Sequence, residues 1–272
     1  MSLDPDYKEK PLKTEIKSVE YDFPTEIFDL PSQGYSYSEE NSLSNGKLRL
    51  KYPSTKEEDI LTSQNLIKKG IYVDEFLKSI IVDSIDYDSL IIGDKNSLMI
   101  AGRILLYGSE YILTDIECSD CGHTANKVNI DLNELTNKEL DVKKLNRLNE
   151  YEYTLPHSKV KLKFKLLSVK DERAITKEVE KHKRLDKSGK DLTGTIRLKH
   201  AIIEINGDDN RNNINNFFEK GKFLSKDSRE FKKHFYELSP NIEMKSEYEC
   251  TQCGAVHQIV VPITTEFFWP ST

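Results

Sequence analysis

The sequence has no long apolar run. Its most hydrophobic short stretches, such as residues 90–92 and 259–261, are only long enough for core segments. A membrane-spanning helix needs about 18 or more consecutive apolar residues. The N-terminus does not resemble a signal peptide either. We therefore expect a soluble protein in a reducing compartment, with no membrane partner.

Motifs that mark enzymes are also missing. The sequence contains no phosphate-binding glycine loop, no GxSxG turn, no HExxH pair and no protein-kinase signature. The adjacent carboxylates Asp208 and Asp209 follow Gly207 in front of an Asn-rich segment. Turn formation and helix capping explain this pair better than acid–base catalysis does. These absences predict a protein without enzymatic activity, without catalytic residues and without a small-molecule substrate.

Neither sign of charge dominates strongly. The 272 residues include 40 Lys and Arg and 46 Asp and Glu, a formal net charge of −6, and the two signs are interspersed along the sequence. Nucleic-acid-binding proteins usually have clustered basic residues. The basic run at residues 181–184 ends a predicted helix that begins with Asp171 and Glu172, so it complements the helix dipole. We expect no nucleic-acid partner.

Cysteine is scarce, and every cysteine belongs to one of two matching repeats, Cys118-Ser-Asp-Cys121-Gly122 and Cys250-Thr-Gln-Cys253-Gly254. Two intervening residues let both sulfurs of a pair face one point, and the following glycine tolerates the positive φ of such a turn. Four thiolates complete the tetrahedral shell of a structural zinc ion. The predicted metal ligands are Cys118, Cys121, Cys250 and Cys253.

The distance between the two pairs is unusual. They are separated by 128 residues, 122–249, whereas about 15–20 residues separate the pairs of an ordinary ribbon. We interpret the pattern as a zinc ribbon with a domain-sized insertion. The metal would then join the C-terminal segment to the middle of the chain.

Other roles for the cysteines are less consistent with the sequence. Disulfides do not suit a reducing compartment, and a redox-active pair would not explain two equivalent motifs without a βαβ context. A catalytic zinc needs an open ligand position and usually histidines. His123 and His257 follow the repeats and could substitute as ligands. A polar or solvent-facing role explains them more simply, so neither is assigned a function.

The remaining pattern predicts an α+β fold that is mainly helical and is arranged around this discontinuous ribbon. Residues 1–30, with three prolines and scattered apolar residues, are expected to form an extended arm. Residues 31–110 form a mainly helical domain, 111–131 and 244–272 form the ribbon, and 132–243 form a mainly helical insertion.

Individual helices follow from caps and periodicity. Ser54 and Glu57 form a capping box, and helices are predicted over 54–70, 73–81 and 94–108, the last with Asp94 as N-cap. Short strand patterns lie at 46–52 and 160–166, and hairpins are expected at 111–130 and 246–263. Further helices are predicted at about 171–185, 195–205, 211–220 and 226–238.

Three aromatic residues stand near the C-terminus, Phe267, Phe268 and Trp269. Such residues either pack under their own domain or anchor an interface. Continuing the alternation of the preceding strand predicts that Phe267 is buried. Phe268 or Trp269 is then expected to reach a partner.

The serial order of several short motifs resembles one protein family. They are Leu30-Pro31-Ser-Gln-Gly34-Tyr35, Glu57-Glu58-Asp-Ile-Leu61, Leu90-Ile-Ile-Gly93-Asp94-Lys95 with Arg103 and Tyr107-Gly108, Leu155-Pro156, Ile203-Glu-Ile-Asn-Gly207, Leu238-Ser-Pro240, both cysteine repeats and Phe267-Phe268-Trp269-Pro270. Together they resemble the baseplate hub, or hub assembly, proteins of T-even-type contractile-tailed bacteriophages. The resemblance covers roughly residues 30–272 and leaves out the arm.

The resemblance implies a non-enzymatic structural or assembly role in the virion tail baseplate. Its partners would be other baseplate and hub proteins, met in the host cytoplasm during assembly. The alternative is a zinc-ribbon protein that binds nucleic acid or regulates transcription, which requires a basic face near the cysteines. Around the repeats only Lys127 is cationic, against Asp120, Asp131, Glu247 and Glu249, so the alternative is disfavoured.

Overall fold

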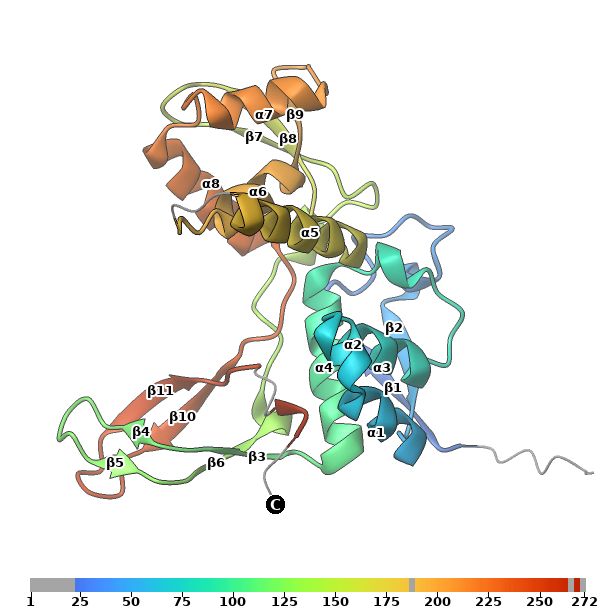
Figure 1. Cartoon of the computed structure of the whole chain (residues 1–272), viewed down its shortest axis with the longest axis vertical. Coiled ribbons are helices and arrows are strands. Elements are labelled where there is room, and N and C mark those ends of the chain that lie inside the picture. The colour runs from blue at the N-terminus through green and yellow to red at the C-terminus, as the bar shows by residue number, and fades with distance from the viewer. Residues whose placement is uncertain (1–22, 186–188, 264–266, 270–272) are drawn as a thin grey trace, which may run out of the picture.

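The computed structural model describes residues 23–185, 189–263 and 267–269. Its elements gather in three groups (Figure 1), an N-terminal group, the inserted residues 132–243 and a ribbon of paired hairpins. Helices account for 42% and strands for 21% of the structure, and all strand pairs are antiparallel. Within the described ranges no helix is both long and apolar enough to cross a bilayer.

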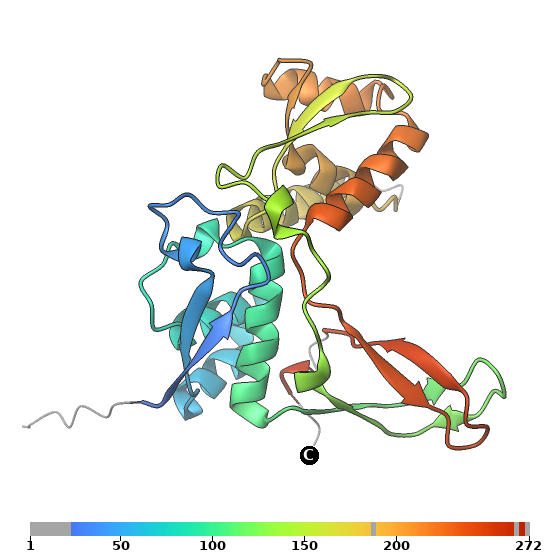
Figure 2. The same ribbon diagram turned by 180° about the vertical axis from the view of Figure 1, so that it is seen from behind.

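Helix α4 (Ile92–Tyr107) connects the three groups. Both Figure 1 and Figure 2 show the insertion at the N-terminal end of α4 and the ribbon projecting from its C-terminal end. A helix of this length spans about 24 Å at 1.5 Å per residue. Since α4 belongs to the N-terminal group, this group fixes the separation of the other two.

The N-terminal group places a two-stranded sheet against helices. Strand β2 alternates, with Leu48 and Leu50 buried and Lys47 and Arg49 exposed, as expected of a strand with one face on the core. Helix α1 begins with the predicted capping box of Ser54 and Glu57. The expected helix over 54–70 is divided at Ser63, which is extended. The other elements of the group are β1 (Thr25–Asp29), β2 (Lys47–Lys51), α1 (Thr55–Thr62), α2 (Gln64–Lys68) and α3 (Tyr72–Ile80).

The predicted arm over residues 1–30 is too long. Residues 1–22 lie outside the described part of the chain, but residues 25–29 form β1 and pair with β2. Leu30 is buried in the core that follows. Backbone hydrogen bonds to β2 order this segment despite its few apolar side chains, a contribution that composition alone does not reveal.

Asp94 is not the N-cap of α4, as the sequence suggested, because the helix begins at Ile92. Its carboxylate is fully buried and accepts hydrogen bonds from the Ser32 amide (2.9 Å), the Ser32 hydroxyl (2.6 Å) and the Tyr37 hydroxyl (2.6 Å). Burial raises the pKa of Asp94 to about 6, although these three hydrogen bonds favour the ionised form. Asp94 thus fixes the turn at residues 31–37 to the start of α4.

The insertion has a three-stranded sheet in the order β7-β8-β9, covered by helices. Its core includes Phe164 and Phe231, whose rings meet edge to face at 5.1 Å between centroids. Residues 202–205, predicted as the end of a helix, form strand β9 on β8. The elements are β7 (Tyr151–Thr154), β8 (Lys161–Phe164), α5 (Val169–Leu185), α6 (Thr193–Ala201), β9 (Ile202–Ile205), α7 (Arg211–Glu219) and α8 (Ser225–Leu238).

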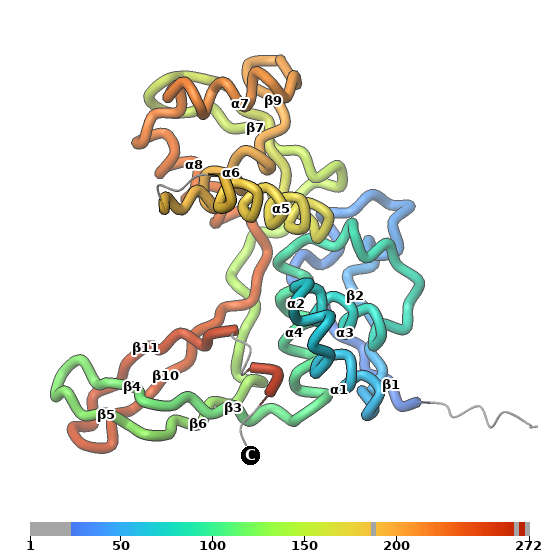
Figure 3. Tube along the Cα trace, in the orientation of Figure 1, coloured from blue at the N-terminus to red at the C-terminus, as the bar shows by residue number. Residues whose placement is uncertain are grey.

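Several contacts join the insertion to the N-terminal group. Lys95 of α4 contacts both Asp74 and Glu172 at 2.9 Å, and the Asn96 side chain donates to the Asn241 side chain at 3.1 Å. The entering and leaving segments of the insertion run side by side (Figure 3) and pair with each other through a bridge between Asn137 and Ile242. At Gly93, an added Cβ would lie 1.7 Å from the Pro240 carbonyl oxygen, so only glycine permits α4 to approach this segment.

The ribbon consists of the two hairpins expected around the cysteine repeats. The first hairpin turns Tyr111, Leu113, Val128 and Ile130 inward, and all four are buried. Tyr248 of the second hairpin is buried as well. The strands are β3 (Glu110–Leu113), β4 (Ile116–Glu117), β5 (Thr124–Ala125), β6 (Val128–Asp131), β10 (Lys245–Glu249) and β11 (Val256–Val260).

The C-terminal aromatic residues return to the N-terminal group. Phe267 is buried as predicted and packs on Tyr111, with ring centroids 5.3 Å apart. Phe268 is buried too, against Phe76 at 5.9 Å, so of the two residues predicted to reach a partner only Trp269 remains available for that role. Trp269 is partly buried and stacks on Tyr72. The apolar surface available on α3 explains why these side chains pack within the chain.

Replacing Phe268 by Ala is expected to lower the free energy of unfolding by about 3–5 kcal/mol, because it leaves a cavity against Phe76. Urea unfolding measures this loss. Trp269→Ala, at a partly exposed site, should cost clearly less and serves as the matched control. Equal stability of the Phe268→Ala variant and the wild type would show that the residue does not complete the core.

Asp94→Asn tests the buried carboxylate. The pKa of Asp94 is about 6 in the folded protein, above its ordinary value of 3.8. The contribution of Asp94 to the free energy of unfolding is therefore fully present below about pH 3.8, and it is lost as the pH rises through about 6. The wild type should therefore lose about 3 kcal/mol relative to the variant between about pH 4 and 7. Urea unfolding across this range measures the difference, with the exposed Asp59→Asn as control. If the difference in unfolding free energy between the wild type and Asp94→Asn did not change with pH, the pKa of Asp94 would not be raised in the folded protein.

Candidate metal centre

The first cysteine repeat forms a tight turn between β4 and β5. The Cys118 amide donates to the His123 carbonyl at 2.8 Å, and the Gly122 amide donates to the Cys118 carbonyl at 2.9 Å. Gly122 has a φ of +70°, which favours glycine. These bonds direct the Cys118 and Cys121 side chains to the same side of the turn.

The second repeat reproduces this turn between β10 and β11. The Cys250 amide donates to the Ala255 carbonyl and the Gly254 amide to the Cys250 carbonyl, both at 2.8 Å. Gly254 has a φ of +73°. An added Cβ at this glycine would meet nothing within 4 Å, so the backbone angle, and not lack of space, requires glycine. The two repeats are therefore equivalent in backbone structure.

The structure brings together all four cysteines predicted as ligands. Their sulfur atoms all lie within 4.8 Å of one another, with Cys118 and Cys253 3.7 Å apart and Cys121 and Cys250 3.8 Å apart. A tetrahedral zinc ion with bonds of 2.3 Å requires sulfurs about 3.8 Å apart. No disulfide links them. The donor set and spacing thus fit a four-thiolate metal ion.

The electrostatic environment favours thiolates at the first position of each repeat. Hydrogen bonds from the backbone of Cys121, followed by Asp120, lower the pKa of the Cys118 thiol to about 6, against the opposing effect of burial. At Cys250 burial raises the pKa, but hydrogen bonds from the backbone of Cys253 and Gln252 outweigh it and lower the pKa. Deprotonated sulfur is the form that binds a metal.

His257, which the sequence analysis weighed as a substitute ligand but left without a role, lies next to the sulfurs. Its Nε2 is 3.2 Å from the Cys118 sulfur, and its Nδ1 is 3.3 Å from the Ser119 hydroxyl. Such a contact orients a metal ligand and stabilises its charge. The strand register could have indicated this position, because His257 lies directly opposite the buried Tyr248 on the neighbouring strand and so faces the same side of the hairpin. His123 contributes its backbone carbonyl to the turn.

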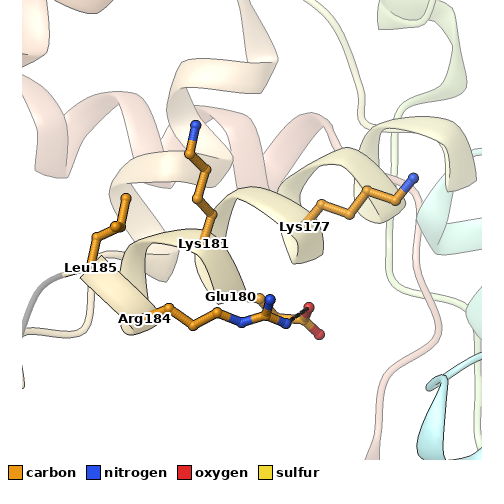
Figure 4. A pocket seen from close by; sticks show the side chains of 5 residues that line it. All are labelled: Lys177, Glu180, Lys181, Arg184 and Leu185. Atoms are coloured by element: carbon orange, nitrogen blue, oxygen red, sulfur yellow. Dashed lines mark ion pairs between the residues drawn. The ribbon is translucent and has the colours of Figure 1, made fainter.

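No second centre of this kind appears among the residues that the structure describes, since no other group of three His, Cys, Asp or Glu side chains could hold an ion. A hollow on α5 is lined by Lys177, Glu180, Lys181, Arg184 and Leu185, all from one helix (Figure 4). Arg184 pairs with Glu180 at 3.6 Å, and both are exposed. The basic run is therefore the solvated end of a helix.

Comparison with known proteins gives one family. The model described as T4 bacteriophage base plate protein matches residues 34–269, a range that includes both cysteine repeats and Phe268. No curated protein and no solved structure matches. The resemblance seen in the sequence motifs is confirmed at the level of the baseplate. Because the match spans well over half of the 272 residues, the chain belongs to the T4 bacteriophage base plate protein family.

Proposed function

We propose that this protein is a non-enzymatic structural or assembly component of the baseplate hub, and that Cys118, Cys121, Cys250 and Cys253 bind a structural zinc ion. Membership of the family supports a structural component of the phage tail baseplate. The approach of all four sulfurs to within 4.8 Å is the observation that carries the metal assignment. Four cysteine ligands close the coordination shell, which suits a structural and not a catalytic ion.

The zinc ion would hold together two segments that are distant in sequence. The repeats lie on separate hairpins, and the insertion, residues 132–243, leaves the ribbon after the first hairpin and returns before the second. In this proposal residues 31–110, the ribbon and the insertion are separate domains. The ion makes the ribbon a rigid projection. Rigid elements of this kind suit a protein that binds other baseplate and hub proteins in the host cytoplasm.

The alternative of a nucleic-acid-binding ribbon receives no support from the charges. Residues 111–131 and 244–263 carry six carboxylates against two lysines, Lys127 and Lys245. Phosphate contacts require clustered Lys and Arg. We therefore favour a protein partner for the ribbon.

Freshly purified protein should contain about one zinc ion per chain, measured by elemental analysis. Because binding free energy at such a site is also folding free energy, a strong chelator should lower the melting temperature substantially. Cys250→Ser should lose the metal, whereas Thr251→Ala, in the same turn but without a ligand atom, should retain it. A metal content below about half an equivalent in the wild type would refute the site.

The hub role predicts where the protein occurs in infected cells. Mass spectrometry of purified virions, baseplates and hub intermediates should detect the chain in at least the intermediates. A finished particle that lacks it would indicate a transient assembly role. Its absence from both particles and intermediates would contradict the proposal, and this outcome is independent of the metal content.

A further inference from the structure

Charge is divided unequally between the parts of the fold. Residues 132–243 carry 25 Lys and Arg against 19 Asp and Glu, a net charge of +6, while the rest of the chain carries 15 against 27, a net charge of −12. The interspersed signs expected from the whole sequence therefore conceal a basic insertion and an acidic remainder. Opposite fields on two parts of one molecule favour association between molecules.

The insertion has an open groove of about 430 Å³ between α6, α7 and α8. Its apolar lining comes from Leu198, Phe218 and Phe223, of which the two phenylalanines are only partly buried. Arg229 and Lys232 line the same groove, and both are exposed. Neither forms an ion pair with any described residue. The groove therefore suits an apolar segment flanked by carboxylates.

The ribbon presents such a segment on the outer face of β10 and β11. Val256 and Val260 are 61% and 67% exposed, and Glu247 and Glu249 are exposed on the neighbouring strand. Glu249 lies directly opposite Val256 in the register. Side chains on alternate positions share one face, so Val256, Val260, Glu247 and Glu249 form one patch, which also includes Lys245 and Gln258. A hollow beside it adds further acidic residues, Glu134 and Glu243.

We propose that the outer face of β10 and β11 of one molecule docks in the α6–α8 groove of a second copy. Both patches combine apolar groups with charged ones, and the net charges of the two patches are opposite, because Glu247 and Glu249 outnumber Lys245 on the ribbon face. The two surfaces cannot meet within one molecule, because the insertion and the ribbon lie at opposite ends of α4 in both views (Figures 1 and 2). The contact is head to tail, so it closes into a ring or continues as an open chain.

Each surface consists of only a few apolar and charged side chains. The interface should therefore belong to the weak class, which buries less than about 1,200 Å². Exposed charge pairs are screened within a Debye length of about 10 Å at 0.1 M salt. Self-association should therefore appear at about 100 μM protein in low salt and should weaken at least tenfold in about 0.5 M salt.

Sedimentation of the full chain tests the proposal with a charge exchange. Arg229→Glu/Lys232→Glu makes the groove acidic, and Glu247→Lys/Glu249→Lys makes the ribbon face basic. Each variant alone places like charges across the contact and should remain monomeric. An equal mixture pairs an acidic groove with a basic ribbon face and a basic groove with an acidic one, so the mixture should associate again.

Matched controls carry the same charge changes elsewhere. Lys68→Glu/Lys69→Glu and Glu39→Lys/Glu40→Lys alter exposed positions of the N-terminal group and should associate like the wild type. Zinc content is measured in every variant, so that unfolding of the ribbon is distinguished from loss of the contact between molecules. A wild type that stays monomeric in low salt, association that survives either exchange, or a mixture that stays monomeric would each overturn the proposal.

Discussion

Arg103 connects the end of α4 and the start of β3 to the C-terminal aromatic residues, which lie 164 positions further along the chain. It is buried, and its guanidinium donates to the carbonyl oxygens of Phe267 and Gly108 at 2.8 Å and of Glu110 at 3.2 Å. Burial lowers its pKa, but a guanidinium stays charged throughout the accessible range. With no carboxylate partner among the described residues, carbonyl dipoles compensate the charge. The end of α4, the start of the ribbon and the C-terminal aromatics all depend on this side chain.

This arrangement explains how a split ribbon keeps its geometry. α4 separates the insertion from the ribbon, Arg103 fixes the base of the ribbon, and the four sulfurs meet near its far end. The ribbon is thus attached at its base, and its two hairpins approach each other again at the cysteines. The insertion contacts α4 through Lys95 and Asn96, which reach Glu172 and Asn241. Both projecting parts therefore keep fixed positions on the N-terminal group.

Local signals made much of this predictable. The repeated cysteines gave the cluster, the capping box at Ser54 gave the start of α1, and apolar periodicity gave most helices within a few residues. The predictions that were wrong concern residues whose structure depends on tertiary contacts. Residues 202–205 form a strand because β8 offers an edge, and Phe268 is buried because Phe76 offers a surface. The position of His257 beside a sulfur depends on the pairing of β10 with β11, so its neighbours in the sequence do not reveal it.

The burial of Phe267 and Phe268 in the N-terminal group has a consequence for synthesis. Domains generally fold as units while the chain emerges from the ribosome, N-terminal parts first. Here the surface of Phe76 and the hydrogen-bonding capacity of Arg103 stay unfilled until residues 267 and 268 have been made. The first group to emerge is therefore among the last to be completed. A nascent or prematurely terminated chain exposes apolar surface that chaperones and proteases recognise, so only chains that extend through these residues become stable building blocks.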